Sequence, residues 1–196
     1  MTDTKSLLMG AVPGVAVAIM LVLAVPGSAL VGTQVTTDSI GPHGYVTVSV
    51  VRDGQEIYHH EDHNVITTVG LDFIRGQIGQ TSGIETNGAN YIALSENADG
   101  EAAGNTALAG EITSVDLARS QGAYAEVSTD AFTITETFAA TGDHTNVQLA
   151  GLFTDDVTGT PDDNDDDGIM VAQNTFTPVT LANGDELTIT WTITLS

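Results

Sequence analysis

The distribution of charge divides this chain into two parts. Residues 6–37 carry no charged side chain, whereas the 159 residues from 38 to 196 hold 25 of the 26 acidic side chains and three of the four basic ones. The uncharged run 7–32 has 26 residues, and a helix needs about 20 apolar residues to cross the core of a bilayer. The sequence therefore predicts an N-terminal hydrophobic anchor helix over residues 1–32.

The anchor prediction depends on large apolar residues spread along the run, which include Leu7, Val15, Ile19, Leu21 and Leu23. Gly10 and Gly14 form a small-xxx-small pair, which lets two membrane helices pack closely, although they would equally suit a helix face that meets only lipid. Two other interpretations of the run stay open. It is either a secretory signal that is cleaved near residues 27–29, or a helix that is buried in a protein assembly.

The net charge indicates the habitat. A formal charge of −22 with only four basic residues destabilises a compact fold by self-repulsion, and salt at about 1 M shortens the Debye length to about 3 Å and removes that penalty. We therefore infer a halophilic origin, in a haloarchaeon or a virus that infects one. So few basic residues exclude nucleic acid as a partner, and the absence of cysteine excludes disulfides and thiolate chemistry.

The remaining residues predict a tether over 33–43 and a single acidic domain over 44–196. Apolar residues at 187, 189, 191, 193 and 195 alternate with threonines, a period-two pattern typical of a strand with one buried face. Asp53-Gly54 indicates a hairpin turn, and residues 68–78 predict one short helix with Thr67 or Thr68 as N-cap. The predicted strands are 44–51, 55–60, 90–95, 124–138 (long or broken), 146–153, 169–176 and 187–195. We expect a mainly β fold, an antiparallel sandwich or jelly roll.

An acidic run at residues 161–168 is the candidate ion site. Asp163, Asp165 and Asp167 precede Gly168, as in the opening of a calcium loop, and Asp155 or Asp156 would supply further carboxylates. Asn174 stands where the closing Glu of an EF-hand belongs, and no helices flank the run. The alternative is a solvated acidic hairpin tip. Calcium is the one cofactor that the sequence suggests.

Other polar residues give weaker signals. His59, His60, Glu61, Asp62 and His63 lie together, but neighbouring strand residues point to opposite faces, which disfavours a metal site. No nucleophile elbow and no glycine-rich phosphate loop is present. The sequence therefore predicts neither an enzyme nor a small-molecule substrate.

Three segments carry a resemblance to a known family. They resemble a β-sandwich domain of tail-fibre and tail-collar proteins of phages and archaeal proviruses, and they cover residues 90–112, 148–153 and 170–196. Residues 63–78 resemble the segment with which that domain begins. The resemblance implies a structural role. Those proteins do not normally carry a membrane helix, so the chain departs from them at its N-terminus.

The anchor and the sandwich together lead to three expected functions. The first is a capsid, shell or spike component of a membrane-containing or enveloped haloarchaeal virion, with its domain on the virion surface or outside the cell. The second is a subunit of a pilus-like archaeal filament, assembled through the N-terminal helix or by strand exchange. The third is a membrane-tethered adhesin. The expected partners are membrane lipid, further copies of the chain and other virion or surface proteins.

Overall fold

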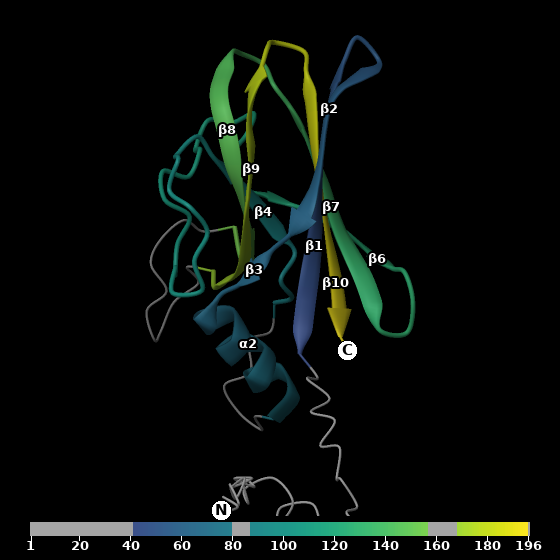
Figure 1. Cartoon of the computed structure of the whole chain (residues 1–196), viewed down its shortest axis with the longest axis vertical. Helices are drawn as coiled ribbons and strands as arrows, with labels where there is room; N and C mark the ends of the chain where they lie inside the picture. Colours follow the sequence, from purple (N-terminus) through teal and green to yellow (C-terminus); the bar gives the residue numbers. More distant parts are fainter. Residues whose placement is uncertain (1–40, 80–86, 157–167, 196) are drawn as a thin grey trace, which may run out of the picture. The chain divides into compact units, whose positions relative to one another are not determined.

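The computed structural model describes residues 41–79, 87–156 and 168–195. In this part of the chain, two five-stranded antiparallel sheets pack face to face as a sandwich (Figure 1). The first sheet has the order β2 (Gln55–His63), β1 (Pro42–Arg52), β10 (Glu186–Leu195), β7 (Ala131–Ala139), β6 (Ala123–Glu126). The second has the order β3 (Val65–Ile66), β9 (Met170–Leu181), β8 (His144–Phe153), β4 (Tyr91–Ser95), β5 (Ser120–Gln121). The predicted mainly β sandwich is confirmed.

Local sequence patterns explain most of these elements. β10 buries its apolar residues at 187, 189, 191 and 193 and leaves its threonines half-exposed, as the period-two pattern predicts, whereas Leu195 at its end is exposed. β1 and β2 form the predicted hairpin, in which Asp53 and Gly54 have φ angles of 52° and 75°. The segment 124–138 is broken into β6 and β7, because a turn at 127–130 reverses the chain. β3 and β5, each two residues long, had no sequence signal.

The one helix of the described residues, α2 (Thr68–Gly79), confirms the helix prediction. Thr67 is its N-cap, because the Thr67 hydroxyl oxygen accepts a hydrogen bond from the Gly70 amide at 2.9 Å. The same hydroxyl donates to the carbonyl of Met170 on β9. Gly70 allows the helix to lie directly on β9, since a Cβ there would stand 2.1 Å from the Val171 carbonyl oxygen. α2 is thereby placed at one end of the sandwich (Figure 1).

Within the described residues the chain passes from one sheet to the other four times, after β2, β5, β7 and β9. After β2 it turns at Asn64, whose amide donates to the Gly44 carbonyl at 3.2 Å, and a Cβ on Gly44 would lie 2.3 Å from the Asn64 side chain. Between β5 and β6 it turns at Gly122, whose amide donates to the Asn90 carbonyl at 2.7 Å. The crossings at Asn64 and Gly122 join edge strands, β2 to β3 and β5 to β6, so they connect the two sheets along both sides of the sandwich.

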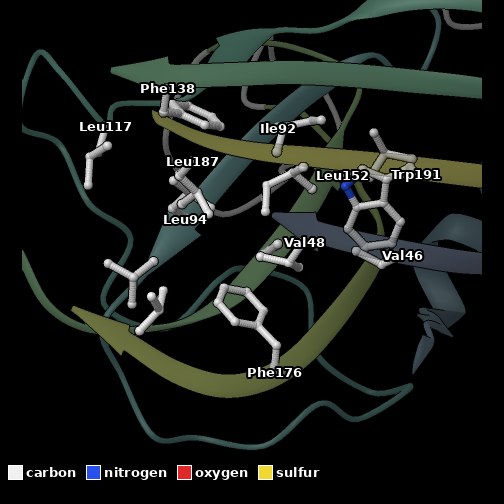
Figure 2. Packing of buried hydrophobic residues seen from close by; sticks show 14 of the residues in the cluster. Val46, Val48, Ile92, Leu94, Leu117, Phe138, Leu152, Phe176, Leu187 and Trp191 are labelled. Atoms are coloured by element: carbon white, nitrogen blue, oxygen red, sulfur yellow. The ribbon is translucent and has the colours of Figure 1, made fainter. Parts of the chain in front are cut away.

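Apolar residues from both sheets fill the space between them (Figure 2). Trp191 on β10 is fully buried, with Val46 and Ile134 as its partners on the neighbouring strands. Figure 2 shows Leu152 of the second sheet in the same cluster. The hydrophobic core therefore lies along the sandwich axis and ends near α2.

Candidate functional site: an apolar cavity where the chain enters the sandwich

The sandwich holds an apolar cavity of about 540 Å³ at the end covered by α2. Phe73, Ile74 and Ile78 of the helix form one wall. The inner faces of the two sheets form the other walls, which include Ile193 and Leu152. α2 contacts mainly β9 of the second sheet, so it covers this end of the core from one side.

The mouth of the cavity has an exposed apolar rim. Ile78, Tyr124 and Leu195 line the cavity and yet are 84%, 61% and 54% exposed to solvent. Pro42, the first residue of β1, also lines it and lies opposite Leu195 in the strand register. The chain therefore enters the described domain directly beside the mouth.

Polar lining residues are few. Among the described residues that line the cavity none is charged, and the long polar side chains are those of Gln77, Asn87 and Asn90. The Asn87 side chain donates to the Asp155 carboxylate at 3.0 Å, so one of these amides already has a protein partner. Cavities of about 300–1,000 Å³ with mostly apolar walls and a few polar groups are typical of small-molecule sites.

The predicted calcium ligands are only partly within the described residues. Asp163, Asp165 and Asp167 lie outside them. Asp155 and Asp156 lie within, and the side chain of Asp155 accepts a hydrogen bond from the Asp156 amide at 2.6 Å. The neighbouring Asp155 carboxylate raises the pKa of Asp156. Among described residues no group of three or more His, Asp or Glu side chains could hold a metal ion, so calcium binding remains a prediction about the acidic run.

The histidine cluster of the β1–β2 hairpin forms hydrogen bonds with acids on the outer face. His59 Nδ1 lies 2.9 Å from Glu56 Oε1 and His59 Nε2 lies 3.2 Å from Glu61 Oε1. These carboxylates, Glu56 first, raise the pKa of His59. His60 points to the opposite face and stacks on Tyr58, with ring centroids 6.5 Å apart. Adjacent histidines therefore diverge, as the strand geometry predicts.

A second histidine, which sequence reasoning missed, connects two loops. His144 Nε2 lies 2.9 Å from Asp116 Oδ2, and His144 Nδ1 lies 3.6 Å from Glu96 Oε1. The Thr141 amide donates to the same Asp116 oxygen at 2.9 Å and, with His144, holds the pKa of Asp116 far below its ordinary value. These residues share no motif, so only the fold brings them together.

Two arginines, also missed by sequence reasoning, make paired hydrogen bonds with carboxylates. Arg119 contacts Glu111 through Nε–Oε1 at 2.9 Å and Nη2–Oε2 at 2.7 Å, and its guanidinium lies 3.6 Å from the centre of the Phe153 ring. Arg52 contacts Asp185 at 2.7 and 2.5 Å and holds the pKa of that carboxyl below its ordinary value. Both geometries are the bidentate arrangement that a guanidinium favours. The pair of Arg52 and Asp185 joins segments that are far apart in the sequence, whereas Arg119 and Glu111 are eight residues apart.

The predicted anchor residues, with the pair Gly10 and Gly14, lie outside the described residues. Within the described part of the chain, no helix has the length and apolar character needed to cross a membrane. Comparison with protein-family models, with curated proteins and with solved structures finds no match.

Proposed function

We propose that this chain is a structural protein of a membrane-containing or enveloped haloarchaeal virion. In this proposal residues 7–32 form a hydrophobic helix in the membrane, and the sandwich stands on the outer surface as a shell or spike component. Its partners are membrane lipid, other copies of the chain and other virion proteins. The resemblance to appendage sandwiches of archaeal proviruses supports the viral origin, and the net charge of −22 supports a habitat of molar salt.

The observation that carries the proposal is the apolar character of the end at which the chain enters. Pro42, the cavity and the exposed side chains of Ile78, Tyr124 and Leu195 lie together there. Exposed apolar patches on a soluble domain commonly mark a surface that meets a partner or a membrane. If residues 7–32 cross a bilayer, the short tether limits how far this end of the domain can stand from it.

One edge of the first sheet weighs against strand exchange, which is one of the two routes expected for a filament. β2 is the edge strand beside β1, and its exposed residues include Glu56, Glu61 and Asp62. Charged side chains on an edge strand oppose the addition of a further strand. The acidic side chains of β2 therefore disfavour a subunit that is joined to its neighbours through this edge.

The proposal is tested with the full chain in a haloarchaeal host grown in molar salt. Density-gradient flotation should place the wild-type chain with membranes. The double variant Leu21→Asp, Leu23→Asp should leave the membrane fraction, because charges at the centre of a span cost roughly 2.5–3.5 kcal/mol each. Thr36→Asp, which adds a charge in the tether outside the run, is the matched control and should float like the wild type.

The virion assignment needs a second readout. Antibody labelling of material released by the virus-producing host should decorate membrane-bounded particles under the electron microscope. Labelling confined to filaments would replace the virion by the surface-filament alternative. A chain that floats normally but labels only the cell surface would instead support the tethered adhesin.

A further inference from the structure

We propose that the cavity beside Pro42 binds the hydrocarbon chain of a membrane lipid. The inference rests on the proposed anchoring of residues 7–32 in a membrane, and it names the ligand of the site.

The walls match a hydrocarbon chain and not a polar ligand. The residues that enclose the cavity are mostly aliphatic or aromatic, as with Phe73, Ile134 and Ile193, and none of the described lining residues is charged. A ligand with a buried charge would lose its hydration without a compensating ion pair. A hydrocarbon chain has no polar group whose hydration would be lost, and each methylene group that it buries raises the affinity roughly fourfold.

The rim lets such a chain enter while its headgroup stays outside. Ile78, Tyr124 and Leu195 are lining residues that remain more than half exposed. They extend the apolar surface of the cavity outward to solvent on α2, β6 and β10. A lipid chain that leaves the bilayer can therefore pass over apolar side chains into the core.

The length of the tether limits the distance between Pro42 and the uncharged run. Residues 33–41 lie between the uncharged run and Pro42, and nine extended residues span at most about 30 Å. Pro42 itself lines the cavity. If residues 7–32 cross the bilayer, lipid is the apolar material at the highest local concentration around the mouth.

Trp191 is a built-in reporter for occupancy of the cavity. It is the only tryptophan of the sequence and is fully buried. Its cross-strand partner Ile134 and its neighbour Ile193 both line the cavity. A brominated hydrocarbon chain that enters the cavity will quench its fluorescence, whereas one that stays in the bilayer has no access to the buried ring.

The test uses the full chain in molar salt, reconstituted into vesicles whose lipids carry either plain or dibrominated stearoyl chains. We expect strong quenching of Trp191 only with the brominated lipid. Ala89→Leu, which adds bulk at a half-buried lining position, should weaken the quenching about tenfold at equal lipid. Ala172→Leu, on the β9 wall, is a second filling variant should the first unfold. Ala125→Phe, on exposed β6 but outside the lining, is the matched control and should behave like the wild type.

Several outcomes would overturn the inference. Absence of quenching in the wild type, or equal quenching in a folded filling variant, means that no lipid chain occupies the cavity. Quenching that appears only after deletion of residues 7–32 identifies the N-terminal run as the occupant of the cavity. Quenching that appears only in the variant Ile84→Ser identifies residues 80–86 as the occupant. Flotation of the same vesicles reports anchoring, and quenching by free dibromostearate reports binding in the cavity. Failure of the proposed anchor is therefore distinguished from failure of this site.

Discussion

Removal of the Arg119 guanidinium should be among the most damaging single changes to this fold. The Arg119 side chain is 2% exposed and that of Glu111 11%. Two hydrogen bonds join them, a third connects Arg119 Nη1 to the Asp155 carbonyl at 3.1 Å, and the guanidinium lies over Phe153. Arg119→Leu leaves the Glu111 carboxylate buried without its partner, which typically costs about 3–5 kcal/mol.

The loss should be measurable by urea unfolding in molar KCl, followed by the fluorescence of Trp191. For a domain of this size, 3–5 kcal/mol corresponds to a fall in Tm of roughly 6–20 °C. Salt should change the result little, because a buried pair is screened far less than a surface pair. The double variant Arg119→Leu, Glu111→Leu should be less destabilised than the sum of its single variants, because it leaves no unpaired buried charge.

Arg75→Leu is the matched control within the same chain. Arg75 lies 3.3 Å from Asp72, but the two side chains are 75% and 61% exposed. Such surface pairs contribute about 0–1 kcal/mol. If Arg119→Leu costs no more than Arg75→Leu, the reasoning from burial and bidentate geometry is refuted.

Two further predictions concern the helix and the β9–β10 turn. Gly70→Ala should lower the free energy of unfolding by about 1–3 kcal/mol, because the added Cβ would meet the Val171 carbonyl oxygen. Gly79→Ala, whose Cβ would lie in open space, should change it by less than about 1 kcal/mol. Similar urea midpoints for the two variants would contradict the packing argument. Arg52 lowers the pKa of Asp185 in the folded state. The stability that this carboxylate contributes is therefore complete above its unfolded pKa of about 3.9. It is lost as the pH falls through the lower folded pKa. Asp185→Asn should therefore cost about 1.5–3 kcal/mol at pH 7, and its difference from the wild type should shrink below pH 4; a constant difference between pH 7 and pH 3 would count against this ion pair.

The local elements of the fold were predictable because each depends on residues that are close in sequence. Alternation of apolar residues and threonines predicted β10, since successive side chains of a strand point to opposite faces. Asp53-Gly54 predicted the first hairpin because its two residues adopt positive φ angles. The threonines at 67 and 68 predicted the start of α2, and the structure shows that the Thr67 hydroxyl caps the first turn. Together these patterns indicated a β-sandwich with one short helix.

The candidate site could not be predicted in the same way. The cavity is lined by residues from Pro42 to Leu195, which are brought together by the order of strands in the two sheets and by the packing of α2 on β9. The pairs of Arg52 with Asp185 and of His144 with Asp116 likewise join residues far apart in the chain. No periodic pattern records which strands become neighbours, because register and sheet order depend on the packing of the whole domain.

The sequence by itself determined the contrast between an uncharged run and an acidic domain, because charge and hydropathy are properties of the residues alone. It also determined the β character of that domain through the alternation of its side chains. Only the tertiary structure decided that the chain enters the sandwich beside an open apolar cavity. That arrangement arises because β1 begins, β10 ends and α2 packs at the same end of the sandwich.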